Sequence, residues 1–129
     1  MKNRLIEYII EKTLTTLGIE HTWHDRQDDL RNPKTGRKLE FDFSLKDSDG
    51  NLFFVEHQGE QHFYECKQYK KFGKQQREET DIQKKEYCKK RGIRLFETRF
   101  DEDIQKAVLR ILDETGIKYD ISKLKGELL

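Results

Sequence analysis

Residues 39–58 contain two strand-like runs joined by a short polar turn, and this pair restricts the fold more than any other part of the chain. In Leu39–Leu45 (LEFDFSL), apolar and polar side chains alternate strictly, so its leucines and phenylalanines share one face. Such alternation is typical of a half-buried β-strand. Asp49-Gly50 is a strong turn signal before the second run, LFFVEHQ. The sequence therefore predicts an antiparallel hairpin centred on position 49.

The same hairpin brings two acids together. Asp42 and Glu56 are equally far from position 49. A loop of three or five residues centred there places their side chains opposite each other on one face of the sheet. Two carboxylates held side by side repel each other unless water or a cation lies between them. The pattern predicts either a cation site or two exposed acids on a solvated face.

The N-terminal part predicts one helix and a polar connection. Apolar residues recur at helical spacing up to a stop at Gly18, with Glu7 at the edge of the apolar stripe and Glu11 towards solvent. Glu7 is thus expected to touch whatever the helix packs on. Residues 19–23 are interpreted as a short strand or an extended link. Residues 25–38 are interpreted as a polar loop, with a turn at the chain's only proline.

The C-terminal part predicts two further helices and one strand. A lysine-rich helix is expected over 75–91, a strand over 93–98, and an amphipathic helix capped by Asp101. A short strand or helical turn is expected beyond Gly116. Together these elements predict one α/β (α+β) domain over residues 1–129, with a mixed central β-sheet that contains an antiparallel hairpin and is flanked by helices.

Positive charge is concentrated in two segments, although the whole chain carries a formal net charge of only +1. Ten basic residues outnumber four acidic ones between Cys66 and Gly92, and a second basic cluster lies within 31–38. Such clusters fit a polyanion-binding face, because phosphate contacts supply most non-specific affinity for nucleic acids. A merely solvated helix face is the alternative. The expected nucleic-acid contacts are Lys67, Lys70, Lys71, Lys74, Arg77, Lys85, Arg37 and Lys38.

Membrane insertion and sulfur-based metal binding are not indicated. No apolar run is long enough to span a bilayer, and Glu7 interrupts the run that a signal peptide would need. Cys66 and Cys88 lie far apart without a zinc-type spacing. The sequence therefore predicts a cytoplasmic domain with reduced thiols and no membrane partner.

The order of elements and acids resembles the PD-(D/E)xK nuclease superfamily, which implies a restriction-endonuclease-like core. Asp42 matches the acid that ends one strand, and Glu56 matches the acid of E-x-K on the paired strand. Gln58 takes the lysine position, and Glu7 corresponds to the helix glutamate. The runs RKLEFDFSL, VEHQGEQHF and DIQKKEYCKKRGIRLFE are similar to those of small phage and mobile-element endonucleases of the very-short-patch-repair-like and homing types. The likeness covers about residues 7–97.

The resemblance implies a metal-dependent DNA endonuclease that hydrolyses phosphodiester bonds by attack of a metal-activated water. Oxygen ligands suit Mg²⁺ or Mn²⁺. The expected metal ligands are Asp42, Glu56, His57 and Glu7. Gln58 carries no charge and can only donate and accept hydrogen bonds. Lys84 is therefore expected to replace the lysine of the E-x-K motif, oriented by Asp81.

The roles of the histidines and aromatics stay open. By strand alternation His57 points away from the acids, which favours a packed, hydrogen-bonded histidine over a ligand. His62 lies beyond Gly59, where the strand is expected to bend. It is either a catalytic group (a phosphate contact, a water-orienting group or a general acid) or a structural one. Trp23 and Tyr64 either stack on bases or belong to the core.

Partners and competing functions follow from the small size of the domain. It cannot enclose a duplex alone, so a homodimer or a specificity partner is expected, on duplex, nicked or branched DNA. If the gene is phage-borne, the host cytoplasm is the expected compartment. A nucleic-acid-binding module of the same fold with a weak or inactive site is the first alternative. A purely structural phage protein is the second, and it leaves the ordered acids unexplained.

Overall fold

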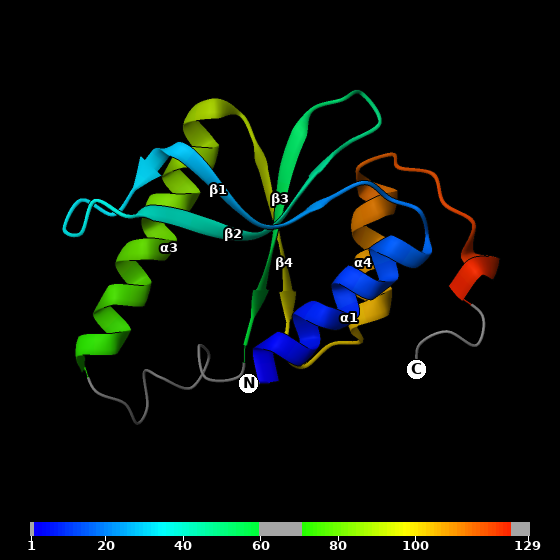
Figure 1. The fold of residues 1–129 in the computed structure, drawn as a ribbon, viewed down its shortest axis with the longest axis horizontal. Helices are drawn as coiled ribbons and strands as arrows, with labels where there is room; N and C mark the ends of the chain where they lie inside the picture. The colour runs from blue at the N-terminus through cyan, green and yellow to red at the C-terminus, as the bar shows by residue number, and fades with distance from the viewer. Residues whose placement is uncertain (1, 60–70, 125–129) are drawn as a thin grey trace.

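The computed structural model describes residues 2–59 and 71–124, and of residues 2, 3 and 71–78 it describes only the backbone. Figure 1 shows the arrangement of the elements. In chain order they are α1 (Lys2–Thr16), β1 (Thr22–Arg31), β2 (Lys38–Lys46), β3 (Leu52–Gln58), α3 (Lys71–Arg91), β4 (Arg94–Arg99), α4 (Ile104–Glu114) and the 3₁₀ helix η1 (Ile121–Leu124).

The four strands form one mixed sheet in the order β1-β2-β3-β4. β1 pairs antiparallel with β2 and β2 with β3, whereas β3 and β4 are parallel. The register pairs Phe43 with Val55 and Lys46 with Leu52, so the connecting loop is 47–51 and is centred on position 49. The predicted hairpin and the mixed sheet flanked by helices are thus confirmed.

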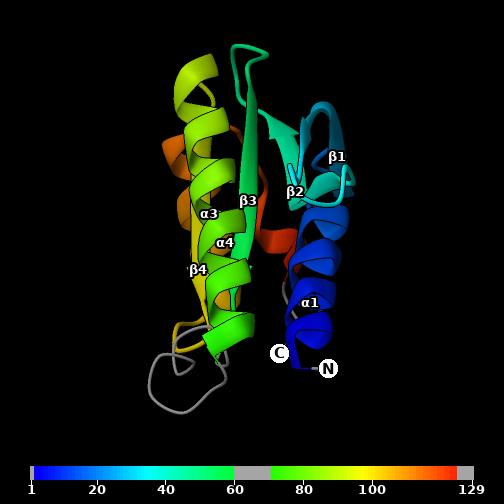
Figure 2. The same ribbon diagram turned by 90° about the vertical axis from the view of Figure 1, so that its left-hand side faces the viewer.

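Helices cover both faces of the sheet, α1 and α4 on one and α3 on the other (Figures 1 and 2). Each interface has its own apolar cluster. The cluster under α1 and α4 includes Ile10, Leu14, Phe43, Val55, Val108 and Leu112. The cluster under α3 consists of the buried residues Leu30, Phe41, Phe54, Tyr87 and Cys88. Burial on both sides explains why the central strand β3 is almost continuously apolar from Leu52 to Val55.

The prediction that all four apolar side chains of β2 share one face was wrong. Phe43 packs under α1 and α4, but Phe41 stacks on Phe54 under α3, with ring centroids 3.8 Å apart. The regular pairing of β2 with β3 stops at Phe43. On the other side, His24 of β1 lies opposite Asp42 with a positive φ of 62°. Irregular backbone at this point changes the face that β2 presents, and the switch is tolerated because both faces are covered by helices.

Residues 25–31 were predicted as loop but continue strand β1. Their polar character misled the prediction, because β1 is an edge strand stabilised by polar pairs to its neighbour rather than by apolar alternation. Arg26 Nε lies 2.9 Å from a Glu40 oxygen, and Lys38 Nζ lies 2.5 Å from an Asp28 oxygen. The predicted turn follows the strand.

The predicted helices are present, with one change of cap. α1 ends before Gly18, whose φ is 74°, and β4 begins one residue later than predicted. α4 is capped by Asp103, whose carboxylate accepts from the Lys106 amide, whereas Asp101 pairs with Arg99. The segment after α4 forms the helical turn η1.

Candidate active site

Asp42 stands at the centre of the candidate site, where regular pairing of β2 with β3 ends. Its Oδ2 accepts a hydrogen bond from the backbone N–H of His57 at 2.8 Å. Partial burial raises the pKa of Asp42 from its ordinary 3.8 to about 7, and the charges of Glu56 and Glu7 act in the same direction. Asp42 therefore feels the negative charges of both other predicted acids, Glu56 and Glu7.

Glu56 is buried on the face of β3 that α3 covers, and it is paired with Lys84. The Nζ atom of Lys84 lies 2.8 Å from Oε2 of Glu56, and the two side chains are only 13% and 10% exposed. Burial raises the pKa of Glu56 despite this ion pair, and the charges of Asp81 and Glu97 add to the effect. The ammonium group also lies 5.4 Å from the ring centre of Phe41. A lysine from α3 thus pairs with Glu56, two residues before Gln58.

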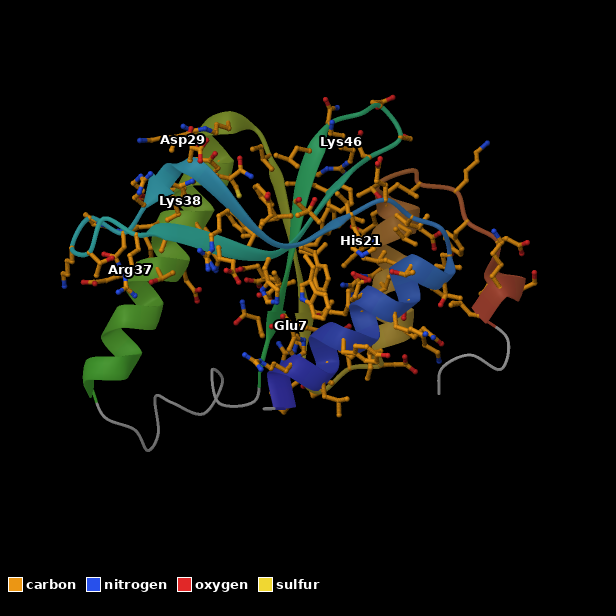
Figure 3. The ribbon with its side chains drawn as sticks, in the orientation of Figure 1. Glu7, His21, Asp29, Arg37, Lys38 and Lys46 are labelled. Atoms are coloured by element: carbon orange, nitrogen blue, oxygen red, sulfur yellow. The ribbon has the colours of Figure 1, made fainter. Side chains whose placement is uncertain are left out.

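Glu7 projects from the N-terminal half of α1 towards the sheet (Figure 3). The indole Nε1 of Trp23 donates to its Oε1 at 3.2 Å, and Nε2 of His24 lies 3.5 Å from the same oxygen. The helix glutamate therefore touches the element on which the helix packs, as predicted. Glu11 is less solvated than predicted, because it accepts hydrogen bonds from His21 and Thr15. Trp23 packs on the core beside Phe43.

Glu97 is a fourth acid in this region, and sequence reasoning missed it. It lies directly beside Glu56 in the parallel register of β3 and β4, and its Oε2 accepts from the amide of Gln58 at 2.8 Å. Because a carboxylate only accepts, this contact fixes the Gln58 amide with its NH₂ towards Glu97. No local pattern in the sequence reveals the register of two parallel strands joined through a long connection.

His57 contributes its backbone to the site and its imidazole to the opposite side of β3. The Nδ1 atom lies 2.9 Å from Oγ1 of Thr98 in the interior, and burial lowers the pKa of the ring. Within the described residues its Nε2 has no partner. The packed-histidine alternative is therefore favoured. The assignment of His57 as a metal ligand is not supported, because strand alternation directs its ring away from Glu56.

The predicted nucleic-acid contacts fall into three groups. His62, Tyr64, Lys67 and Lys70 lie outside the described residues, as does Cys66. Lys71, Lys74 and Arg77 belong to α3, but their side chains are not described. Lys85 and Arg37 are exposed, and Lys38 pairs with Asp28.

The two basic segments meet, because Nζ of Lys34 in the β1–β2 turn lies 3.4 Å from a carboxylate oxygen of Glu79 on α3. Figure 3 shows the labelled Arg37 and Lys38 on the part of the β1–β2 hairpin that lies beside α3.

A second contact fixes α3 across β1. The hydroxyl of Tyr87 donates to Asp29 at 2.7 Å, and Arg91 donates to the other oxygen of the same carboxylate at 2.6 Å. The guanidinium also lies 4.0 Å from the centre of the Tyr87 ring. Burial, together with the hydrogen bond to Asp29, raises the pKa of Tyr87 to about 12. Sequence reasoning missed this contact, since its members are 58 and 62 positions apart.

In the described part of the chain, oxygen atoms are better candidate metal ligands than sulfur. Across residues 2–59 and 71–124, no three His, Cys, Asp or Glu side chains are already arranged to hold an ion. Asp42 and Glu56 nevertheless suit Mg²⁺, which commonly uses one or two carboxylates and retains several waters. Cys88 is a free, buried thiol whose pKa is raised to about 11 by burial, which makes it a poor ligand.

Comparison with known proteins does not assign a family or a function to this chain. No family model matches the chain, and searches of curated proteins and of solved structures found no match. In the described part of the chain, no helix has the length and apolar character needed to cross a membrane.

Proposed function

We propose that this protein is a metal-dependent DNA endonuclease with a restriction-endonuclease-like core. The observation that carries the proposal is the cluster of Asp42 and Glu56 with Lys84, held between a hairpin and a basic helix. The charge of buried Glu56 disfavours ionisation of half-buried Asp42, and a divalent ion of the kind that hydrolyses phosphodiesters would relieve this repulsion.

The residues fit a Mg²⁺ or Mn²⁺ ion on chemical grounds. Asp42 has one backbone hydrogen bond to offset its burial, and its raised pKa reflects the remaining imbalance. A divalent cation shared with Glu56 would remove the repulsion, and Glu7 is placed to assist from α1. When bound, such an ion polarises a phosphoryl oxygen and makes water nucleophilic at neutral pH.

The chain's own residues supply the remaining functions. Lys84 provides the positive charge that the E-x-K lysine provides elsewhere, and it is held near Glu56 before any substrate arrives. Gln58, oriented by Glu97, offers its carbonyl oxygen as an acceptor for a water proton. The basic residues of α3 and of the β1–β2 turn hold the phosphate backbone without reading sequence. A homodimer or a specificity partner would supply the second cut or the choice of site.

One observation favours a second candidate, a nucleic-acid-binding module that does not cut. Gln58 is engaged by Glu97 and Lys84 by Glu56, so the site is partly neutralised as it stands. Such a module would bind DNA equally well with and without a divalent ion.

The deciding experiment is a cleavage assay on supercoiled plasmid, single strands and branched junctions, with Mg²⁺ or Mn²⁺. We expect the wild type to cut, and Asp42→Ala and Glu56→Ala each to lower the rate by at least about 100-fold, since an ion's electrostatic stabilisation is worth several kcal/mol. Asp49→Ala in the exposed hairpin turn is the matched control and should cut normally. Cutting that survives loss of either Asp42 or Glu56 rules out the proposed site, and binding without cutting identifies the module.

A further inference from the structure

His24 has an unusual backbone for a residue inside a strand. Its φ of 62° makes it the sole non-glycine with positive φ in the described part of the chain. That region is uncommon for a residue with a Cβ, although asparagine, aspartate and histidine adopt it more often than the other non-glycine residues. Because backbone strain of this kind concentrates at functional sites, the imidazole at position 24 calls for a functional explanation.

The strain changes the direction of the side chain. Neighbouring residues in a strand normally point to opposite faces. The rings of Trp23 and His24 instead lie on the same side, stacked with centroids 5.2 Å apart and planes 14° from parallel. Both rings reach the same oxygen of Glu7, at 3.2 Å and 3.5 Å. Regular backbone would turn the imidazole away from Glu7.

The other side of the imidazole is anchored. Its Nδ1 lies 2.6 Å from Glu40, whose second oxygen accepts from Arg26 at 2.9 Å. Because carboxylates only accept, the Nδ1 that lies 2.6 Å from Glu40 carries a proton, and Nε2, 3.5 Å from Glu7, attracts that carboxylate when it carries a proton as well. His24 also lies opposite Asp42, between the paired positions Trp23–Phe43 and Asp25–Phe41.

We propose that His24 is a positioning residue that holds Glu7 beside Asp42 in the nuclease site. The proposal rests on the proposed function, because the reason to hold Glu7 there is its part in that chemistry. The fold accepts a strained backbone at His24 so that two aromatic rings, anchored through Glu40, fix one carboxylate. Sequence reasoning missed His24 because nothing in the sequence signals the positive φ.

The first test compares two substitutions that both remove the imidazole. His24→Gly relieves the strain and His24→Ala retains it, so the Tm of His24→Gly should be about 3–6 °C higher. Both should lower kcat alike, on the order of 10- to 100-fold, with KM within about twofold, as for a displaced catalytic group. His21→Gln is the control, since His21 is bound to Glu11 and Ile19 and should lose stability without losing kcat.

A double-mutant cycle with Glu7→Gln identifies the route of the effect. If His24 acts through Glu7, the combined variant should be no slower than the slower single variant. Independent, multiplying losses with a raised KM would show that His24 contacts the substrate instead, and would overturn the proposal. If the wild type cuts DNA and His24→Gly cuts it equally fast, the positioning role of His24 is also overturned. The proposed function is not affected by that result.

A measurement that needs no activity completes the test. Trp23 is the only tryptophan, so the protein has one indole N–H resonance, and this N–H donates to Glu7. Glu7→Gln should shift that resonance strongly when His24 is present and much less in the His24→Gly background. Equal shifts in both backgrounds overturn the positioning role. This readout remains decisive even if the wild type cuts no substrate, an outcome that overturns the proposed function alone.

Discussion

Asp42 is the residue whose protonation should differ most between the folded and unfolded chain. Its folded pKa of about 7 exceeds the ordinary 3.8. Between these values the folded protein keeps a proton that the unfolded chain releases, so the free energy of unfolding falls as pH rises from about 4 to 7. Asp42→Asn should therefore raise this free energy by on the order of 2 kcal/mol at pH 8 and leave it nearly unchanged at pH 3.5.

Urea denaturation at both pH values measures this difference. Asp49→Asn in the exposed turn is the matched control, with no pH-dependent gain expected. If Asp42→Asn raises the free energy of unfolding equally at both pH values, the folded protein does not disfavour the ionised form of Asp42.

Lys84 gives a second prediction at this scale. Lys84→Met should leave Glu56 buried without its cation, at a cost of about 3 kcal/mol near pH 8. The loss should shrink at low pH, where Glu56 becomes protonated. Lys85 is an exposed neighbour on the same helix, so Lys85→Met should change the free energy of unfolding by no more than about 0.5 kcal/mol. In the cleavage assay, an unchanged rate for Lys84→Ala would remove Lys84 from the mechanism.

The helices and strands that have a clear local sequence pattern could be predicted from the sequence. The hairpin followed from alternation and an Asp-Gly turn, and α4 followed from its apolar spacing. Strand β1 was missed because an edge strand supported by ion pairs lacks alternation. The opposite burial of Phe41 and Phe43 was missed because it occurs where regular β2–β3 pairing ends, beside the positive φ of His24, and no sequence pattern marks either feature.

The candidate site was predictable to a similar extent. Asp42 and Glu56 followed from the hairpin register, and Lys84 and Glu7 were matched through the resemblance. Glu97 joins them only through a parallel register that no local signal encodes.

The contact between Tyr87 of α3 and Asp29 of β1 gives a prediction about how these two elements are held together. Tyr87→Phe and Asp29→Ala should each lower the free energy of unfolding by at least about 1 kcal/mol, because each removes their hydrogen bond. The double variant should lose less than the sum, because both changes remove one contact. Tyr119→Phe is the matched control, since Tyr119 also donates to an exposed aspartate, Asp113, but is less buried than Tyr87, so a smaller loss is expected. Additive losses in urea denaturation would mean that this contact does not fix α3.

At the scale of the whole molecule, the two basic segments of a near-neutral chain lie in contact in the described part of the structure. The β1–β2 turn and α3 meet through Lys34 and Glu79. If this surface binds DNA, affinity should fall steeply with salt. Arg37→Ala should reduce the slope of log affinity against log salt by about 0.9, the value for one lost phosphate contact. Lys118→Ala, exposed beyond α4, should leave the slope unchanged.

Binding and cutting should also separate across the molecule. Asp42→Ala should keep the wild-type salt slope while losing cleavage, because the proposed function assigns the acid to the metal site and not to the phosphate contacts. Filter binding over a range of salt concentrations, in the presence and absence of Mg²⁺, measures both effects. A slope that changes with Asp42→Ala would place the acid cluster within the electrostatic binding surface and would contradict the division proposed between basic helix and acidic hairpin.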